Sequence, residues 1–383
     1  MLEKIVLYNF KSYKDCTEID FKRTNYASLM DNVSSTDVLK TMMFVGGNAS
    51  GKSTIVEAIK YLLDALFEEK NITRKNYKCR FGDGESYKLV YYFMIDGQKI
   101  CYSIKNNIVK RMLTEELSID DNMYMNRKGT SATSYIIDKT GQDFDSTDVD
   151  EETLFLRTLY FNTKFTTNET LKKWMQYLLS SVYINLFDDI ITSYGKKDYR
   201  ITNYLTENGT DAINSFFEKY NFKQTIEYEN YSAGKHGSIS IINGEKEIFF
   251  KRRGIDEPIL FNEESLGNRN LLKILPSFLD VVDNGGLLLI DEFSSGFHNE
   301  LENLLIKYFN KESDNAQLIF VSHSTNLLSN SLLRPDQMYS VEFFDQEGSK
   351  VRRFSSEKPR TSQNIEKMYA SGIFGGLPEY NEV

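Results

Sequence analysis

One short glycine-rich segment constrains this chain more than any other part of it. Residues 46–53 have the spacing Gly-x-x-x-x-Gly-Lys-Ser, and they follow an apolar run at residues 42–45. Beyond them, apolar residues recur at i, i+3 and i+4 over residues 55–67, which predicts a helix. A strand, a glycine loop and a helix in this order form a cradle, in which backbone N–H groups at the positive end of the helix surround phosphate oxygens. The sequence therefore predicts a phosphate-binding loop in an α/β fold.

The loop offers two side chains with separate chemical tasks. Lys52 can reach the β- and γ-phosphates of a nucleotide, and the hydroxyl of Ser53 can ligate Mg²⁺. Gly46, Gly47 and Gly51 let the backbone turn its N–H groups toward anionic oxygens. We therefore expect this loop to bind a nucleotide together with Mg²⁺.

The composition is that of a globular chain. Of its 383 residues, 40% are hydrophobic, 26% are charged and only five are proline, which argues against long disordered regions. The first residues read directly as a strand without signal-peptide architecture, and no apolar run reaches the roughly 18 residues of a membrane span. We expect a cytoplasmic protein, because its three isolated cysteines fit a reducing compartment. The formal net charge of −9 disfavours a uniformly basic nucleic-acid binder but leaves a local basic groove open.

The pattern of the chain changes twice, which suggests a core divided by an insertion. Residues 1–110 read as strands around the loop, and Asp96-Gly97 between two apolar stretches predicts a hairpin. Residues 120–150 are polar, and we expect loops there. The predicted parts are the N-terminal half of the core, residues 1–110, an inserted and mainly helical lobe, residues 111–260, and the C-terminal half of the core, residues 261–383.

The insertion is expected to contain helices and one hairpin. Apolar periodicity predicts helices at residues 154–160 and 171–186, with Trp174 as a core side chain. A second hairpin is predicted at residues 238–250, with its turn at Asn243-Gly244. The insertion lacks sustained heptads, so a long coiled coil is not expected.

The last third of the chain alternates strand and helix again. Continuous apolar runs predict buried strands at residues 287–290 and 318–321, and residues 301–309 between them predict a helix. Buried strands joined by helices are typical of a parallel sheet. We therefore expect an α/β fold with a mainly parallel core sheet, an antiparallel β subdomain and the inserted lobe.

Charged side chains follow both of these buried strands. Asp291 and Glu292 stand at the end of the first strand and His323 just past the second, where α/β sheets bind their ligands. Asp291 suits binding of Mg²⁺ through water, and Glu292 can accept a proton from the water that attacks a γ-phosphate. A lone acidic turn or a lone histidine would be structural, but their order after the phosphate loop favours His323 as a γ-phosphate sensor.

A further serine and glycine lie upstream of the carboxylates. Ser265 and Gly267 precede an apolar helical pattern at residues 271–275. The serine can be a helix N-cap. It can equally present its hydroxyl and N–H groups to a second phosphate site. The residues alone leave both interpretations open.

Together these elements resemble the ATP-binding-cassette class of ATPases, in the branch of the RecF, SMC and OLD proteins. The resemblance covers residues 1–67 and about 260–383, and it implies an ABC-type head that hydrolyses ATP with Mg²⁺. In that class residues 46–53 look like the Walker A loop, residues 287–292 like the Walker B strand, and His323 like the switch histidine.

The resemblance extends to two motifs of the C-terminal half. Ser265 and Gly267 fall in the signature motif, which departs from Leu-Ser-Gly-Gly-Gln because Leu266 stands where glycine is usual. Residues 295–298 occupy the place of the D-loop, and His298 resembles a histidine of bacterial defence ATPases in this branch.

The N-terminal half carries a further motif. Residues 9–13, Asn-Phe-Lys-Ser-Tyr, look like the opening motif of the branch, whose basic residue, here Lys11, lies near the nucleotide. Gln98 and Gln142 are candidates for the Q-loop glutamine, without convincing context for either. The residues that the resemblance implies as nucleotide contacts are Lys11, Gly46, Gly47, Asn48, Ala49, Ser50, Gly51, Lys52, Ser53, Thr54, Ser265 and Gly267.

The resemblance also implies a mechanism. Lys52, Glu292 and His323 would act in catalysis, and Ser53 and Asp291 would hold Mg²⁺. Two chains would form a homodimer head to tail through their nucleotide-binding faces, with each ATP between the loop of one chain and the signature segment of the other, and higher oligomers remain open. ATP binding would then favour assembly, and hydrolysis would reverse it.

The last residues narrow the family further. Residues 364–378 resemble the closing Tyr-x-x-Gly-x-Phe-Gly-Gly-x-Pro of the AbiLi/RloA-like abortive-infection ATPases. Such ATPases look like sensors or scaffolds that respond to a phage-derived trigger and control a separately encoded effector, commonly a nuclease. A helix and a glycine turn that close the sheet would give the same pattern for structural reasons.

Two other functions compete with the defence interpretation. A RecF-like repair ATPase would bind DNA directly, but the short basic runs at residues 251–253 and 352–353 look more like solvated strand ends than a DNA groove. An OLD-type nuclease needs an appended domain with clustered carboxylates, and the residues after His323 contain no such cluster. We therefore expect the defence function, with repair as the alternative.

Overall fold

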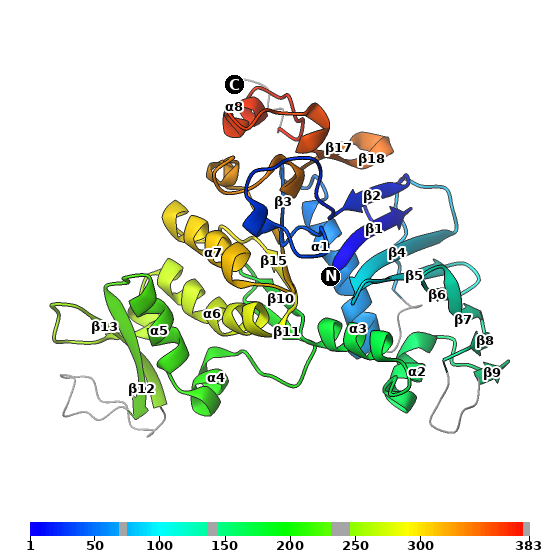
Figure 1. Ribbon diagram of the computed structural model, residues 1–383, viewed down its shortest axis with the longest axis horizontal. Helices are drawn as coiled ribbons and strands as arrows, with labels where there is room; N and C mark the ends of the chain where they lie inside the picture. The colour runs from blue at the N-terminus through cyan, green and yellow to red at the C-terminus, as the bar shows by residue number, and fades with distance from the viewer. Residues whose placement is uncertain (69–74, 137–143, 231–245, 378–383) are drawn as a thin grey trace.

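The computed structural model describes residues 1–68, 75–136, 144–230 and 246–377 (Figure 1). Its centre is a seven-stranded sheet in the order β11-β10-β15-β16-β3-β17-β18. Five neighbouring strands of this sheet run parallel, and an antiparallel strand flanks them at each edge. The strands are β3 (Thr41–Gly46), β10 (Val182–Asn185), β11 (Ile190–Ser193), β15 (Gly286–Asp291), β16 (Ala316–Val321), β17 (Met338–Phe344) and β18 (Gly348–Arg353).

The prediction of a mainly parallel core sheet is confirmed. Every residue of β3, β15 and β16 is buried, as expected for strands that helices cover on both faces. On one face lie α1 (Lys52–Leu63) and α3 (Glu169–Leu179), and on the other lie α6 (Leu266–Asn284) and α7 (Asn299–Glu312) (Figure 1).

A second sheet of eight antiparallel strands packs on the α1 side, in the order β2-β1-β4-β5-β6-β7-β8-β9. The predicted hairpin at Asp96-Gly97 is confirmed as β4 and β5. Trp174 of α3 is fully buried and packs against Phe93 and Tyr102 of this sheet, as a core side chain. The strands are β1 (Leu2–Tyr8), β2 (Thr17–Asp20), β4 (Ser86–Ile95), β5 (Gln98–Asn107), β6 (Met112–Ile119), β7 (Asn122–Lys128), β8 (Ser131–Ser134) and β9 (Phe144–Ser146).

Two predictions for the insertion are wrong. Residues 120–150 are not loops throughout, because they contain β7, β8 and β9, whose core positions include a buried charged side chain, Arg127. The helix predicted at residues 171–186 ends at Leu179, and the apolar residues after it form β10 in the core sheet. Helix α2 (Phe155–Thr163) matches the other helix prediction.

A smaller lobe stands beside α6, at the left of Figure 1. It consists of α4 (Ile201–Asn208), α5 (Asp211–Lys219) and a three-stranded sheet of β12 (Gln224–Asn230), β13 (Lys246–Arg252) and β14 (Ile259–Leu260). The turn and first strand of the hairpin predicted at residues 238–250 lie outside the described residues, and β13 pairs with β12. The three-part division of the chain stays a prediction, and these strands lead us to propose that the inserted lobe is the unit from α4 to β14.

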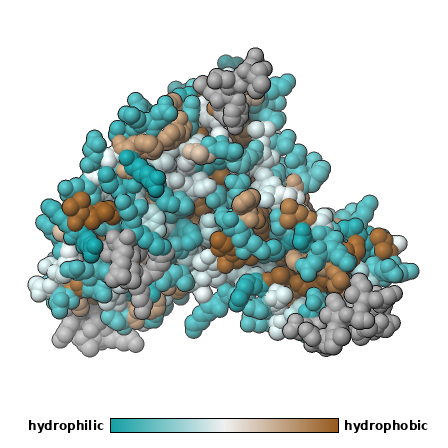
Figure 2. All heavy atoms as spheres, turned by 180° about the vertical axis from the view of Figure 1, so that it is seen from behind, coloured by the Kyte–Doolittle hydropathy of each residue, from teal (hydrophilic) through white to brown (hydrophobic). Residues whose placement is uncertain are grey.

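Hydrophilic residues cover most of the face shown in Figure 2, and hydrophobic residues form separate patches on it. Among the described helices, none combines the length and the apolar character that a membrane crossing requires. The short α8 (Ile365–Ala370) lies beside β17 and β18, at the top of Figure 1.

A fully buried ion pair fixes the entry into β17. Arg334 and Asp336 are 0% exposed, and their Nε and Oδ1 atoms are 2.9 Å apart. Asp336 also accepts hydrogen bonds from the backbone N–H (2.7 Å) and hydroxyl (2.9 Å) of Thr24. Burial acts to raise the pKa of Asp336, but the hydrogen bonds from Arg334 and Thr24 outweigh it and hold the pKa below its ordinary value.

We expect Asp336→Asn to lower the free energy of unfolding by about 3–5 kcal/mol at pH 7, because it leaves the charge of Arg334 buried without its partner. The folded-state pKa of Asp336 is depressed, so its stabilising effect is present above the unfolded value of about 3.9 and is lost as the pH falls further. The measurement is urea unfolding of the wild type and of Asp336→Asn at pH 7 and at lower pH. The difference between their free energies of unfolding should become smaller as the pH falls. The matched control is Asp37→Asn in the exposed pair with Arg23, which should cost less than about 1 kcal/mol.

Candidate active site

The glycine loop joins β3 to α1, as predicted, and its geometry admits only glycine at two positions. Gly46 and Gly51 have φ values of 153° and 106°. A Cβ on Gly46 would lie 2.2 Å from the carbonyl oxygen of Val341, and one on Gly51 would lie 2.4 Å from Oγ of Ser349. The loop therefore packs directly against β17 and β18, and the N-terminal end of α1 follows it.

Lys52 folds back over this loop. Its Nζ donates hydrogen bonds to the carbonyl oxygens of Gly46 (3.0 Å) and Gly47 (2.7 Å). Burial lowers the pKa of Lys52, and the nearby carboxylates of Glu292 and Asp291 act in the opposite direction. The ammonium group thus lies at the mouth of the loop, where an entering phosphate can replace the two carbonyls as its partner.

Ser53 and Asp291 come together from two different elements. The hydroxyl of Ser53, on the first turn of α1, donates a 3.0 Å hydrogen bond to Oδ1 of Asp291 at the end of β15. Burial raises the pKa of Asp291, and the hydrogen bond from Ser53 opposes that shift. A hydroxyl and a carboxylate are the hard oxygen ligands that Mg²⁺ takes in proteins, so this donor set fits the ion.

Glu292 follows Asp291 with a left-handed backbone. Its φ is 57°, which is uncommon for a residue with a side chain and is found at functional sites. One of its carboxylate oxygens lies 3.5 Å from Nε2 of His323, and both side chains are more than one-third exposed. The fold thus brings the predicted general base, Glu292, and the predicted γ-phosphate sensor, His323, to one place.

One cavity of about 390 Å³ contains most of the predicted residues. The loop forms one side, and Glu292 and His323 form the other. Its lining also includes Ser12, which sequence reasoning did not assign. The lining residues are Ser12, Asn48, Ala49, Ser50, Gly51, Lys52, Ser53, Thr54, Glu292 and His323.

Lys11 does not line this cavity. Its ammonium group pairs with Glu57 and lies 5.4 Å from the centre of the Tyr77 ring. Together with Asp291 it lines an adjacent hollow of about 350 Å³. Lys11, which was predicted to lie near the nucleotide, therefore lies beside Asp291, one of the predicted magnesium ligands, and not at the loop.

Ser265 and Gly267 are also apart from the loop cavity. Ser265 is the N-cap of α6 and its hydroxyl accepts a 3.4 Å hydrogen bond from the N–H of Asn268, so the capping interpretation is confirmed. A Cβ on Gly267 would lie 2.5 Å from the carbonyl oxygen of Gly296, which explains the glycine. The signature segment and the D-loop segment are thus in contact within one chain.

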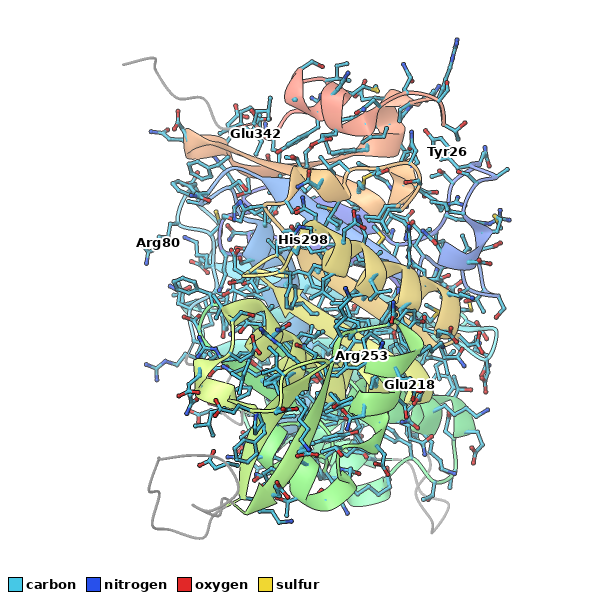
Figure 3. All side chains as sticks on the ribbon, turned by 90° about the vertical axis from the view of Figure 1, so that its left-hand side faces the viewer. Tyr26, Arg80, Glu218, Arg253, His298 and Glu342 are labelled. Carbon is cyan, nitrogen blue, oxygen red and sulfur yellow. The ribbon has the colours of Figure 1, made fainter. Side chains whose placement is uncertain are left out.

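Hydrogen bonds to β13 and to the D-loop segment hold the residues around the signature segment in place. Glu264 is buried, and both of its carboxylate oxygens accept from Nη2 of Arg252 on β13, at 2.7 and 2.8 Å. Asn270 donates a 2.9 Å hydrogen bond to the carbonyl of Ser295. His298 is the N-cap of α7, with Nδ1 accepting from a backbone N–H, and Figure 3 shows it at the start of that helix.

Sequence reasoning missed a residue next to Asp291, one of the predicted magnesium ligands. Asn185 ends β10 and pairs in register with Asp291, while its side chain donates a 2.9 Å hydrogen bond to Asp188. Of the two candidates for the Q-loop, Gln98 lies in the eight-stranded sheet and contacts Asp120, and Gln142 falls outside the described residues. Asn185 could have been identified from the sequence because it is a polar residue at the end of an apolar run, as Asp291 is.

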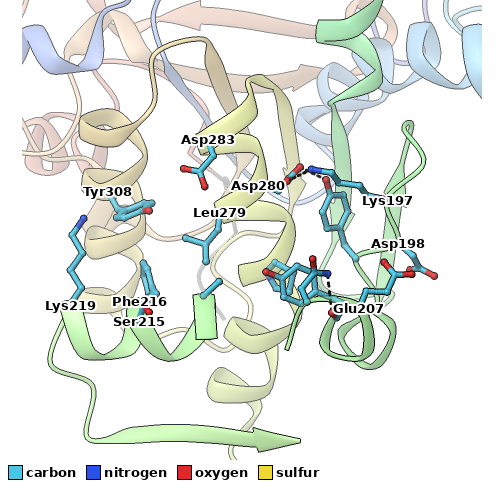
Figure 4. A pocket seen from close by; sticks show the side chains of 15 residues that line it. Lys197, Asp198, Glu207, Ser215, Phe216, Lys219, Leu279, Asp280, Asp283 and Tyr308 are labelled. Carbon is cyan, nitrogen blue, oxygen red and sulfur yellow. Dashed lines mark hydrogen bonds and ion pairs between the residues drawn. The ribbon is translucent and has the colours of Figure 1, made fainter. Parts of the chain in front are cut away.

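A larger hollow, of about 480 Å³, contains none of these residues. It lies between the small lobe and the helices α6 and α7 (Figure 4). Some of its charged groups have partners, because Asp280 accepts hydrogen bonds from both Lys197 and Tyr199, and Lys219 pairs with Glu312.

Comparison with known proteins places the chain in a family. Residues 1–208 match the family described as "AAA ATPase domain". Residues 203–329 match a family described as "AAA domain, putative AbiEii toxin, Type IV TA system". No curated protein matches the chain.

Solved structures show which fold this is. The chain is similar to the Smc head domain with an extended coiled coil bound to the C-terminal domain of ScpA, derived from Pyrococcus furiosus, with a TM-score of 0.51, 14% identity, and coverage of 93% of this chain and 97% of that one. It is also similar to the Smc head bound to the C-winged helix domain of ScpA, with a TM-score of 0.50, 16% identity, and coverage of 91% and 96%. The fold is thus the α/β fold of Smc heads, with a mainly parallel core sheet and antiparallel sheets beside it. Because the first family spans more than half of the sequence, the chain belongs to the AAA ATPase domain family.

Proposed function

We propose that this chain binds and hydrolyses ATP at the loop cavity, and that it is the ATPase component of a bacterial anti-phage defence system. The observation that carries the proposal is the convergence of Lys52, Ser53, Asp291, Glu292 and His323 around one glycine loop. Phosphoryl transfer needs positioning and charge stabilisation more than covalent chemistry, and these residues provide both. Membership of the AAA ATPase domain family supports the same reaction.

Binding falls to the loop and to two oxygen ligands. The backbone N–H groups of residues 48–54 would surround the β-phosphate, and Lys52 would move from its two carbonyl partners to the β- and γ-phosphates. Ser53 and Asp291 would hold Mg²⁺, which supplies positive charge next to the phosphates. Asn185, beside Asp291, is our candidate for the residue that orients water at this position.

Proton transfer falls to Glu292. Its carboxylate faces the cavity opposite the loop, so it can accept a proton from water that attacks the γ-phosphate. His323, 3.5 Å from Glu292, would contact the γ-phosphate and orient the carboxylate. The left-handed backbone at Glu292 supports a functional role, because such a conformation is retained where the site requires it.

A second copy of the chain would complete the site. Ser265 is exposed and does not line the loop cavity of its own chain, which is consistent with a contact to the nucleotide of a partner. Contact between Gly267 and Gly296 would then let one interface position both the signature and the D-loop segments. ATP would stabilise this head-to-tail dimer, and loss of the γ-phosphate would weaken it.

The defence role rests on two further observations. The family that matches residues 203–329 carries toxin–antitoxin wording in its description, and residues 364–378 have the pattern of abortive-infection ATPases. The small lobe from α4 to β14 offers a surface for a separately encoded effector, which we expect to be a nuclease, or for a phage-derived trigger. Arg252 of this lobe pairs with Glu264, the residue before Ser265. A partner that binds the lobe and moves Arg252 would therefore shift the signature segment.

Ion pairing argues against the repair alternative. Lys251 pairs with Glu227 and Arg252 pairs with Glu264. Arg353 donates to backbone carbonyl oxygens of its own chain. Within the described residues, these basic side chains are therefore already partnered, and DNA would have to compete for them.

The test is the mass of the Glu292→Gln protein in solution, measured by light scattering after size exclusion with and without ATP and Mg²⁺. The product of the adjacent gene and a duplex DNA are each added in separate runs. We expect an ATP-dependent dimer that carries the neighbouring product. An ATP-dependent dimer that ignores this product and takes up DNA would favour repair, and a monomer under all conditions would contradict the proposed assembly.

A further inference from the structure

The segment after α8 touches the phosphate-binding loop directly. The backbone N–H of Gly47 donates a 3.1 Å hydrogen bond to the carbonyl oxygen of Gly376. The N–H of the same Gly376 donates a 3.1 Å hydrogen bond to Oε2 of Glu342 on β17. Two hydrogen bonds thus connect Glu342 to the loop through the backbone of a single residue, Gly376, and Figure 3 shows Glu342 close to the C-terminal helix.

This segment, residues 372–377, is held in place by independent contacts. The hydroxyl of Tyr369 donates to the carbonyl of Gly376 (3.0 Å), and that of Ser340 donates to the carbonyl of Phe374. The rings of Phe374 and Phe354 stack with centroids 3.9 Å apart and planes inclined by 6°. The segment is therefore an ordered part of the core-sheet edge.

Two adjacent glycines are required for the approach. Gly375 and Gly376 have φ values of 68° and 76°. A Cβ on Gly375 would lie 2.7 Å from Oε2 of Glu342, and one on Gly376 would lie 3.0 Å from Cβ of Ser340 and 3.3 Å from the carbonyl of Val341. Val341 is also the residue whose carbonyl faces Gly46, so loop and segment rest on the same part of β17.

We propose that residues 372–377, held by Glu342, are a positioning element for the phosphate-binding loop. The inference rests on the proposed binding of ATP at that loop. The Gly376 carbonyl fixes the second residue of the loop before a nucleotide arrives, so less conformational entropy is lost on binding. Glu342 acts through Gly376 and does not touch the nucleotide, which makes it a positioning residue.

The first test compares Glu342→Ala with Glu342→Gln. Alanine removes the acceptor of the Gly376 N–H, whereas glutamine keeps an acceptor oxygen at the same place. We expect alanine to raise the Kd for a fluorescent ATP analogue about tenfold, equivalent to about 1.4 kcal/mol, and glutamine to restore it to within about twofold of wild type. Turnover at saturating ATP should change less than the Kd. Equal Kd values for all three proteins would overturn the proposal.

The second test uses glycines with the same backbone conformation. Gly376→Ala meets both a positive φ and neighbouring atoms, whereas Gly372→Ala has a φ of 81° with nothing within 4 Å of its Cβ. The readout is hydrogen exchange, without nucleotide, of the peptide that contains Gly47. We expect faster exchange in Gly376→Ala than in Gly372→Ala, and equal exchange would overturn the proposal even if Glu342→Ala failed to fold.

The two readouts separate this inference from the proposed function. If the wild-type protein does not bind ATP, the proposed function fails, while faster exchange in Gly376→Ala would still support positioning. If the wild type binds ATP and neither the exchange nor the Kd responds to the variants, the positioning role fails and the ATPase proposal stands.

Discussion

Glu292→Gln is expected to lower the turnover number for ATP at least about 100-fold, because a positioned general base contributes about 10²–10⁴ in rate. Glutamine keeps the size and the hydrogen-bonding capacity of the side chain near His323, so ATP binding should be retained. Removal of a negative charge beside Lys52 should not weaken the binding of an anion. Phosphate release in a single turnover measures the chemical step, and equilibrium binding measures the affinity.

The matched control is Glu300→Gln. Glu300 is an exposed glutamate on the first turn of α7, close in sequence to the site but outside the loop cavity. We expect it to hydrolyse ATP at the wild-type rate. If Glu292→Gln did so too, Glu292 would not be the general base, and the water would have to be activated by another group.

Lys52→Ala should weaken ATP binding by about 100-fold or more. Truncating one partner of a buried, hydrogen-bonded charge pair costs about 2–5 kcal/mol, and each 1.4 kcal/mol is about a factor of ten in the dissociation constant. Lys52 is 5% exposed, and its two partners in the free protein are backbone carbonyls that a phosphate can replace. Calorimetric titration with ATP and Mg²⁺ measures the effect.

Two controls guard this second prediction. Lys307→Ala removes an exposed lysine from α7 and should leave the affinity unchanged. The thermal midpoint of Lys52→Ala without nucleotide should stay near that of wild type, which would show that the loop is still folded. An affinity within threefold of wild type would contradict the assignment of Lys52 to the phosphates.

The core of the fold was predictable because its strands are apolar throughout. Residues 287–290 and 318–321 form continuous apolar runs, and every residue of β15 and β16 is buried. The loop was predictable because its glycines are required by positive φ values and by close approach to Val341 and Ser349. Buried strands require apolar residues and the loop requires glycine, so in both cases the residues in the sequence directly indicate the local structure.

The strands β6 and β7 could not be recognised because a charge pair occupies their core positions. Glu115 and Arg127 are essentially fully buried, with Nη1 and Oε1 3.0 Å apart. Glu115 also accepts hydrogen bonds from the hydroxyl of Tyr102 (2.7 Å) and from the N–H of Phe155 (2.8 Å) at the start of α2. An alternation of inward and outward residues is present in β6, but the hydropathy pattern reads the inward glutamate as a surface residue.

The start of β10 could not be predicted for a different reason. An apolar segment that follows a helix cannot be separated from it by periodicity alone, and residues 182–184 directly continue the pattern of α3. As a consequence, Asn185 was not recognised as a neighbour of Asp291. The capping role of Ser265 was predictable from the sequence, whereas its proposed contact with the nucleotide of a partner stays a prediction, because a contact across an interface leaves no pattern of burial in one chain.

The order of strands in the core sheet has a consequence for biosynthesis. β3 carries the phosphate-binding loop and is flanked by β16 and β17, which lie some 270 or more residues later in the chain. During translation, the hydrophobic strand of residues 41–46 therefore emerges from the ribosome long before either neighbour exists. Contacts so distant in sequence make folding slow and leave the edges of β3 open to aggregation until β16 and β17 have been synthesised. We therefore expect the loop to take its final shape only after β16, β17 and β18 have been synthesised, because it rests on Val341 of β17 and Ser349 of β18.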